Sequence, residues 1–415
     1  MSQKHRMGVV DRLAVGLALL SMADRVVKLG LVADFFARRR RPPEPASWPT
    51  VTILQPVTRG VAALRANLEA RLQMDYPAHV QYILLCDVAD TKLQAVCAAT
   101  VAAHPEADLR IVRVSGCSGR DGYGNGAEAE EAEAMGAAPK LEKLQVGLPY
   151  ATGDVLCLMD DDVAPRRDAL RRLVSYLMEP GVGASFGLAC YTNFENVWSS
   201  LLSTYVNLYD VEYFVTWTDL CGPVRVVGQM ACYWKRPFLA AGGFDGLEAF
   251  LDDDFVLSQR LQRSGLRAVQ APVVYDVNDP VDSWRGYAKK FQRWITLPRH
   301  GMEPFLTPWQ RMAAFLATPA TVLLPTTLSA VALGSRRKVP LAALGATLGA
   351  FMATNSILCK RILQREMPRS RWPLFLCAVL VTPVHAALMV LAGHEIEWRG
   401  QRLRLSRDGR FKRIV

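Results

Sequence analysis

The sequence predicts an α/β domain with a mostly parallel sheet, joined to apolar helices near both ends of the chain. Short hydrophobic strands alternate with helices through the first part of the chain, and this alternation is typical of parallel βαβ units. Three apolar runs follow at residues 312–333, 339–358 and 372–393. Each run is about long enough to cross a bilayer. We therefore expect a membrane-associated α/β protein.

The composition narrows the kinds of molecule that the protein is expected to bind. The 415 residues include 49 Lys plus Arg against 39 Asp plus Glu, a formal net charge of +10, and 51% are hydrophobic. Positive residues gather beside apolar segments, as at 38–41, 336–338 and 399–413. This placement favours a membrane surface with anionic lipid over nucleic acid, which we do not expect as a partner. The nine cysteines contain no CxxC pair, as in reduced cytoplasmic proteins.

Residues 1–48 form the first predicted segment, a membrane or interfacial helix with a basic linker. The apolar stretch 9–36 is interrupted by charged residues, so no uncharged run reaches the ~20 residues of a comfortable span. It is either a weak span or a helix lying in the membrane interface. The basic residues 38–41 are the wrong flank for a cleaved signal peptide and would stay on the cytoplasmic side.

Residues 49–304 form the predicted α/β domain. Asp87, Asp160 and Asp162 each follow a predicted strand, where an open parallel sheet places its ligands. Residues 115–136 interrupt the pattern with a Gly-rich and then acidic stretch, which predicts a surface insertion. The predicted strands are residues 51–57, 80–86, 109–114 and 155–159, and the predicted helices are 64–72, 93–104 and 139–149.

An acidic triplet, Asp160 to Asp162, ends the last of these strands. Because strand side chains alternate, Asp160 and Asp162 are expected to point the same way. Two convergent carboxylates suit Mg²⁺ or Mn²⁺, and the residues do not distinguish the two ions. Such a cation keeps positions for phosphate oxygens and could neutralise charge on a departing nucleoside diphosphate. The alternative is a solvated acidic turn.

A second triplet, residues 252–254, follows later in the chain and precedes Arg293 and Trp294. This order of acidic and aromatic residues indicates a metal-dependent transferase of nucleotide-activated sugars.

The C-terminal part divides into predicted membrane-embedded helices, residues 305–393, and a basic cytosolic tail, residues 394–415. Both linkers between the apolar runs are positively charged, so the positive-inside rule does not settle their sides. The first run contains Pro319 and Pro325 and is either a span or a re-entrant hairpin. The number of spans stays open.

Several motifs occur in a definite order along nearly the whole chain, and together they resemble those of the ceramide glucosyltransferases, glycosyltransferase family 21, and of related bacterial hopanoid-pathway glycosyltransferases. The resemblance implies a GT-A (Rossmann-like) catalytic domain with N-terminal and C-terminal membrane helices, a UDP-sugar donor, a lipid acceptor and inversion at the anomeric carbon. The motifs that carry it are Asp-Val-Ala-Asp at 87–90, Gly-Ala-Ala-Pro-Lys-Leu-Glu-Lys-Leu at 136–144, the triplet 160–162, Gly-Gly-Phe at 242–244 with Asp-Asp-Phe at 253–255, Lys-Phe-Gln-Arg-Trp at 290–294, and Trp-Arg-Gly-Gln-Arg-Leu-Arg-Leu at 398–405.

The same resemblance implies roles for individual residues. Asp254 would be the general base, and Arg293 and Trp294 would complete the catalytic set. Asp160 and Asp162 would hold the diphosphate through the cation. The implied donor-binding residues are Asp87, which would contact the uridine, with Asp90 as the alternative first aspartate, and Lys140, Asp161, Asp253 and Lys290.

Departures from the family pattern concern the donor and the acceptor more than the reaction. Lys290 replaces Gln or Arg, Ala138 and Lys143 each replace Asn, and Leu403 replaces Tyr. Lysine is a point charge that cannot make a planar bidentate contact. Which hexose or hexuronic acid is donated is therefore left open.

The expected function is a membrane-bound inverting glycosyltransferase that moves one sugar from a UDP-sugar to a hydroxyl of a membrane lipid, with ceramide as the expected acceptor. The alternatives are a processive polysaccharide synthase and a non-catalytic membrane scaffold. Short loops and the absence of an organelle address fit a bacterial inner membrane with the catalytic domain on the cytoplasmic face.

Overall fold

The computed structural model describes residues 7–38, 42, 44–58, 61–115, 140–247, 250, 252–391, 395–398, 401–406 and 410–414. The chain forms two compact units, each built from separate stretches of sequence. The helical unit comprises Met1–Arg38, Ser200–Gly222 and Leu306–Leu391, and the α/β unit comprises Arg39–Ser199, Pro223–Phe305 and Ala392–Val415. Residues 200–222, which fall inside the predicted 49–304 domain, therefore belong to the helical unit.

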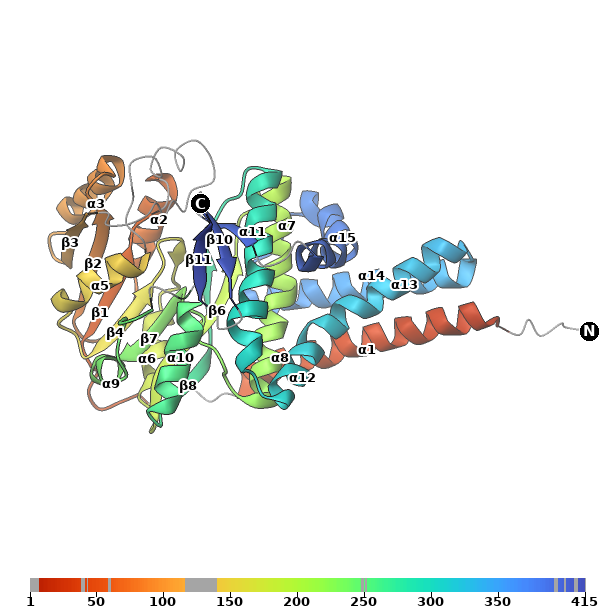
Figure 1. Cartoon of the computed structure of the whole chain (residues 1–415), viewed down its shortest axis with the longest axis horizontal. Coiled ribbons are helices and arrows are strands. Elements are labelled where there is room, and N and C mark those ends of the chain that lie inside the picture. The colour runs from red at the N-terminus through yellow and green to blue at the C-terminus, as the bar shows by residue number, and fades with distance from the viewer. Residues whose placement is uncertain are drawn as a thin grey trace, which may run out of the picture. The chain divides into compact units, whose positions relative to one another are not determined.

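The α/β unit is built on an eight-stranded sheet whose order is β3-β2-β1-β4-β7-β6-β8-β5 (Figure 1). Among the described strands, β1 pairs in parallel with β2 and β4, β2 with β3, and β6 with β8, whereas β7 and β5 pair antiparallel with their neighbours. Four of these seven pairings are parallel. The strands are β1 (Val51–Pro56), β2 (Val80–Asp87), β3 (Asp108–Val114), β4 (Val155–Met159), β5 (Val163–Ala164), β6 (Val182–Tyr191), β7 (Met230–Trp234) and β8 (Arg267–Val277).

Helices flank the sheet, and a small antiparallel sheet follows near the C-terminus. Polar side chains start several of the helices: Asp90 accepts a hydrogen bond from the Leu93 N–H, and Ser283 accepts one from the Gly286 N–H. The helices are α2 (Val61–Leu72), α3 (Thr91–Ala103), α5 (Lys140–Gly147), η1 (Leu148–Tyr150), α6 (Ala169–Leu177), α9 (Lys235–Ala240), α10 (Asp253–Arg263), α11 (Trp284–Leu297), η3 (Pro298–Met302) and η4 (Glu303–Phe305), and the small sheet contains β9 (Glu395–Trp398), β10 (Gln401–Leu405) and β11 (Phe411–Ile414).

The strands β1 and β4 lie at the centre of the eight-stranded sheet, and the burial of their side chains matches this position. All six residues of β1 and all five of β4 are buried, as expected for parallel strands covered on both faces. One face of β4 and β7 packs Leu156, Leu158 and Tyr233 against Leu257 and Leu261 of α10. This packing places the start of α10 beside the sheet, where β4 ends.

The predicted strands at 51–57, 80–86, 109–114 and 155–159 are confirmed as β1 to β4, and the helices at 64–72 and 93–104 as parts of α2 and α3. The helix predicted over 139–149 is found as α5 and the short η1. Residues 116–136 of the predicted insertion and the first part of the 136–144 motif lie outside the described residues, which resume at Lys140.

The helical unit holds the apolar segments. Within the described residues, Lys338–Leu363 and Arg369–Leu388 are long and apolar enough to cross a membrane. Pro308–Ala317 and Ala320–Ser335 meet at a 49° bend and together would make a third span or a re-entrant loop. The unit contains α1 (Val9–Arg38), the end of α7 (Val197–Tyr205), η2 (Val206–Asp210), α8 (Val211–Cys221), α12 (Pro308–Ala317), α13 (Pro319–Ser335), α14 (Lys338–Ile357), η5 (Leu358–Leu363), η6 (Arg369–Arg371) and α15 (Trp372–Leu391).

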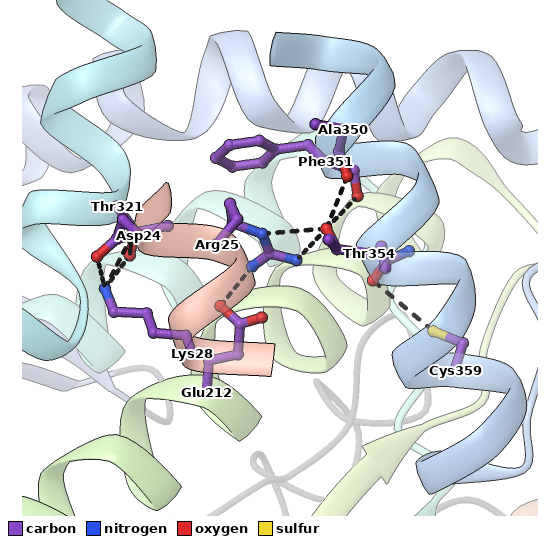
Figure 2. A network of polar contacts seen from close by, with 10 residues as sticks. Asp24, Arg25, Lys28, Glu212, Thr321, Ala350, Phe351, Thr354 and Cys359 are labelled. Atoms are coloured by element: carbon purple, nitrogen blue, oxygen red, sulfur yellow. Dashed lines mark hydrogen bonds and ion pairs between the residues drawn. The ribbon is translucent and has the colours of Figure 1, made fainter. Parts of the chain in front are cut away.

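Charged residues of α1 are paired inside the helical unit (Figure 2). Arg25 forms an ion pair with Glu212 of α8, and its Nη2 donates to Thr354 Oγ1 of α14 at 3.2 Å. Lys28 pairs with Asp24 at 2.9 Å and contacts Thr321 of α13. The polar face of α1 thus points inward and binds three other helices.

Candidate active site

The turn after β4 separates the three aspartates of the first triplet. The Asp160 N–H donates to the Gln229 carbonyl at 2.9 Å, and the Asp160 carboxylate pairs with Lys140 Nζ at 2.5 Å. The Asp161 carboxylate turns toward the end of β1, where it accepts hydrogen bonds from the Thr58 main-chain N–H and hydroxyl. Asp160 keeps 20% of its side chain exposed, whereas Asp162 is 1% exposed. Of the three, Asp160 is thus the most accessible.

Arg71 of α2 lies buried beneath this turn. Its Nη2 donates to the main-chain oxygens of Asp160 and Val163. Burial lowers the pKa of Arg71 to about 10, while the charges of the three aspartates oppose that shift. Arg71 therefore stays charged at neutral pH and offsets the acidic turn. The sequence gives no signal for this role, because an isolated arginine on a helix is usually exposed.

The second triplet begins α10. Asp252 caps the helix by accepting from the Phe255 N–H at 3.3 Å, and it pairs with Arg225 at 3.2 Å. Asp254 Oδ2 accepts from the Gly228 N–H at 3.1 Å. Burial, and next the charge of Asp253, raise the pKa of Asp254 to about 7. This carboxyl group thus titrates where a general base operates at neutral pH.

Gly228 makes the close contact to Asp254 possible. A Cβ added at this position would lie 1.9 Å from Asp254 Oδ1, so any other residue would displace the carboxylate or the strand entry. Ser258 supports the same contact, because its hydroxyl donates to the Asp254 main-chain oxygen and accepts from the Val226 N–H, both at 2.7 Å. The segment before β7 and the first turn of α10 therefore hold Asp254 from two sides.

The two triplets form one electrostatic cluster. The charge of Asp160 helps to raise the pKa of both Asp253 and Asp254, and the Lys140 ammonium opposes both shifts. Burial raises the pKa of Asp253 more than any of these charges. The structure thus brings the charges of Asp160, at the end of β4, close to Asp253 and Asp254 at the start of α10 and to Lys140 at the start of α5.

Asp87 and Asp90 have different surroundings. Asp87 is the last residue of β2, is buried, and its Oδ1 accepts from the Ala89 N–H at 2.8 Å. Asp90 uses its carboxylate to cap α3. In the sheet order β1 separates β2 from β4, so Asp87 lies at the same end of the parallel strands as Asp160 but two strands away.

Helix α11 carries the predicted Arg293 and Trp294, both half-buried. The Trp294 ring meets the Tyr191 ring edge to face, with centroids 5.8 Å apart and an interplanar angle of 87°. Gln229 Nε2 donates to the Tyr191 hydroxyl at 3.2 Å, which links Trp294 to the turn at Asp160. Lys290 on the same helix is buried in an ion pair with Asp279.

Lys143, which stands where the family pattern has Asn, is also buried. Its Nζ donates to the Val57 main-chain oxygen at 3.0 Å, so it ties α5 to the end of β1. Sequence reasoning missed Arg71, Gln229 and Asp279, because each acts through a residue distant in the sequence. A polar residue at a predicted buried position is the signal that would have drawn attention to Lys143.

The acidic cluster suits a hard cation only in part. The described residues contain no group of three or more His, Cys, Asp or Glu side chains that could hold a metal ion. Asp160 and its neighbours Asp253 and Asp254 offer carboxylate oxygens, the ligand type that Mg²⁺ and Mn²⁺ prefer. The donor set therefore fits a cation whose remaining ligands come from a bound diphosphate.

The chain is similar to proteins of known structure. The chain is similar to the mannosyltransferase PcManGT from Pyrobaculum calidifontis in complex with GDP-Man and Mn²⁺, at 18% identity over 92% of this chain and 99% of that chain, with a TM-score of 0.49. It is also similar to glucosyl-3-phosphoglycerate synthase from Mycobacterium tuberculosis in complex with Mn²⁺, UDP and glucosyl-3-phosphoglycerate, at 14% identity over 60% of this chain and 79% of that chain, with a TM-score of 0.36.

The predicted fold class is confirmed, since a GT-A-type α/β unit is joined to C-terminal helices apolar enough to span a membrane. Residues 13–411 match the family model described as glycosyl transferase family 21. This match covers nearly the whole sequence and includes both triplets, α11 and the apolar helices. The chain therefore belongs to glycosyl transferase family 21.

Proposed function

We propose that this glycosyltransferase moves a single sugar from a UDP-sugar to the hydroxyl group of a membrane lipid, with ceramide as the acceptor. The observation that carries the proposal is that Asp254, held by the Gly228 N–H and with its pKa raised to about 7 chiefly by burial, lies close enough to the partly exposed Asp160 to feel its charge. An inverting transfer needs a base near neutral pKa and a group that binds the leaving diphosphate. These two carboxylates supply both.

Asp160 and Asp162 would hold Mg²⁺ or Mn²⁺ together with the donor diphosphate. The cation would supply positive charge to the leaving diphosphate. Lys140, 2.5 Å from Asp160, would add a second positive charge for a phosphate oxygen. Arg71, buried behind the turn, keeps the aspartates in place when no donor is bound.

Asp254 would take the proton of the acceptor hydroxyl as the acceptor oxygen bonds to C1 of the sugar and the bond from C1 to the diphosphate breaks. The Gly228 N–H holds one oxygen of this carboxylate, so the main chain sets the direction of the base. Attack on the face opposite the leaving group inverts the anomeric centre. Asp253 favours this role because its charge raises the pKa of Asp254.

The remaining residues would bind the donor or position those that do. We assign the uridine contact to Asp87, since the Asp90 carboxylate caps α3. Arg293 would pair with phosphate oxygens and Trp294 would pack against the sugar or the acceptor. Asp161 and Lys290 would act through their contacts with Thr58 and Asp279.

The helical unit would hold the protein in the membrane. Leu20 of α1 is 59% exposed, as are other apolar residues of that face, whereas Arg25 is 0% exposed and paired. Apolar residues outside and paired charges inside are the arrangement that a bilayer favours. We therefore propose that α1 is embedded beside α13 and α14. The basic residues 38–41 that follow α1 favour the cytoplasmic face of a bacterial inner membrane for the α/β unit.

The two alternatives explain fewer of these features. A processive synthase needs a transmembrane channel, and the described residues contain two candidate spans, or three with the bent pair. A scaffold does not require Gly228, whose missing side chain lets the Asp254 carboxylate, with its raised pKa, contact the main chain. Both alternatives remain outcomes of the test that follows.

The test is a mass spectrum of the lipid extract from ceramide-containing membranes, incubated with the purified protein and a panel of UDP-sugars. We expect a hexosyl- or hexuronosyl-ceramide that disappears in Asp160→Ala and Asp254→Ala, and on chelation of divalent cations. Asp245→Ala, at an exposed aspartate, is the matched control and should retain activity. A polymer product would favour the synthase, and no product with any donor would favour the scaffold.

A further inference from the structure

Gln229 contacts two parts of the site with two different groups. It lies just before β7 and is half-buried. Its main-chain oxygen accepts from the Asp160 N–H at 2.9 Å. Its side-chain amide donates to the Tyr191 hydroxyl at 3.2 Å. The residue therefore joins the end of β4 to the end of β6.

Tyr191 extends this link to α11. It is the last residue of β6 and is buried, and its ring meets Trp294 edge to face. The energy of such a pair depends on the mutual orientation of the rings. A hydrogen bond at the Tyr191 hydroxyl restrains that ring and, through it, the Trp294 indole. The Gln229 amide thus reaches Trp294 through one intermediate side chain.

The preceding residue makes the link relevant to the reaction. The Gly228 N–H donates to Asp254, so successive residues before β7 contact the general base and the turn that carries Asp160. Only the third contact, from the Gln229 amide, is made by a side chain. A substitution at 229 can therefore remove the link to Trp294 and leave both main-chain contacts in place.

We propose that Gln229 is a positioning residue that orients Trp294 relative to Asp160 and Asp254 for the transfer step. The inference rests on the proposed function, in which Trp294 packs against the sugar or the acceptor. The donor diphosphate is held by other groups, so loss of the amide should slow transfer without weakening nucleotide binding. The alternative is that Gln229 only hydrogen-bonds the buried Tyr191 hydroxyl, so that its loss affects stability and not transfer.

Kinetics of four variants separate these readings: Gln229→Leu, Tyr191→Phe, the double variant, and Gln262→Leu as a control on the exposed face of α10. We expect kcat to fall roughly tenfold in each single variant and no further in the double, because both remove the same link. The Kd of UDP with Mn²⁺ should stay within about twofold of wild type in all four. An unchanged kcat, multiplied losses in the double, or lost UDP binding in either single variant would overturn the proposal.

A second readout does not require activity. In protein labelled with 5-fluorotryptophan, the ¹⁹F resonance of Trp294 is identified by its loss in Trp294→Phe. It should shift in Gln229→Leu and Tyr191→Phe and stay in place in Gln262→Leu. If Gln229→Leu does not fold, Tyr191→Phe alone decides the test, because it deletes only the hydroxyl oxygen of the link. An unshifted resonance rejects the link, whereas shifted resonances in a protein that transfers no sugar would reject the proposed function only.

Discussion

Asp254 combines a main-chain hydrogen bond with a setting that disfavours its charge. Its pKa is raised to about 7 by burial and by Asp253, whereas an aspartate in an unfolded chain titrates near about 3.9. Between these values the folded protein binds the extra proton. The ionised carboxylate therefore costs stability, and this cost grows as pH rises through the folded-state pKa.

Asp254→Asn should accordingly stabilise the protein at about pH 8 and leave it unchanged at about pH 4, because the amide never ionises. We expect a higher Tm at the higher pH, since each unit by which folding raises the pKa costs the ionised form about 1.4 kcal/mol. Thermal unfolding in detergent at both pH values measures this. A Tm that rises equally at both would show that the charge of Asp254 carries no cost.

The same pKa predicts how rate depends on pH. Transfer requires the ionised base, so kcat/KM should fall tenfold per pH unit below an apparent pKa of about 7. A bound cation stabilises the ionised cluster and should move the acid limb of kcat to lower pH. Rate profiles at low and saturating Mn²⁺ test both points. A profile that is flat between about pH 5 and pH 8 would exclude Asp254 as the base.

Gly228→Ala should disable the site without unfolding the α/β unit. The added methyl would lie 1.9 Å from Asp254 Oδ1, and the carboxylate can move more easily than the strand entry. We expect kcat to fall at least about a hundredfold, as when other positioned catalytic groups are displaced. Circular dichroism should be unchanged. The control is Gly345→Ala on α14, where an added Cβ meets nothing within 4 Å, and it should leave kcat unchanged.

Residue identity was predictable where chemistry and strand position agree. Asp160 was expected from its place at the end of a strand, and Asp253 and Asp254 were expected from the second acidic triplet. The structure brings their charges close together, and their roles stay predictions. Arg71 and Gln229 were not predictable, because their roles depend on which main-chain atoms face them after folding. Local sequence contains no record of such contacts.

At the scale of elements, helix α11 is held by a buried ion pair. Lys290→Met would leave Asp279 buried without its lysine, which should cost about 3–5 kcal/mol. Adding Asp279→Leu should recover most of the loss, since a buried pair can be replaced by apolar groups at little cost. Chemical unfolding measures both variants. If the double variant is stable but binds UDP weakly, Lys290 contacts the donor after all.

Elements with a simple local hydrophobic pattern were predicted from the sequence. Elements whose position depends on pairing or packing with distant segments were not. Strands β1 to β4 are apolar runs bounded by turns, so their positions follow from composition. Strand β7 has five residues and inserts antiparallel between β4 and β6, which no local pattern indicates. Residues 200–222 resemble any apolar helix, and their place in the helical unit depends on long-range packing.

For the molecule as a whole, the chain passes repeatedly between its two units. The helical unit gathers α1, α8 and α12 to α15 from distant parts of the sequence. Polar contacts join α1 to α8, α13 and α14 (Figure 2). Sequence alone left α1 undecided between a span and an interfacial helix, because its charges count against insertion. Their pairing with Glu212 and Asp24 removes that objection.

The Arg25–Glu212 pair offers a test of this arrangement. Arg25→Leu or Glu212→Leu alone would leave one buried charge among apolar helices, which should destabilise the helical unit by about 3–5 kcal/mol. The variant that carries both changes removes the two charges together and should recover most of that stability. Arg12→Leu, at an exposed position of α1, is the control. Two measurements separate the outcomes: thermal unfolding in detergent and hydrogen exchange of the α1 amides in lipid nanodiscs. Recovered stability in the double variant, together with protected α1 amides, would support an embedded helix. If the stability losses of the two single variants simply add in the double variant, each charge has other partners.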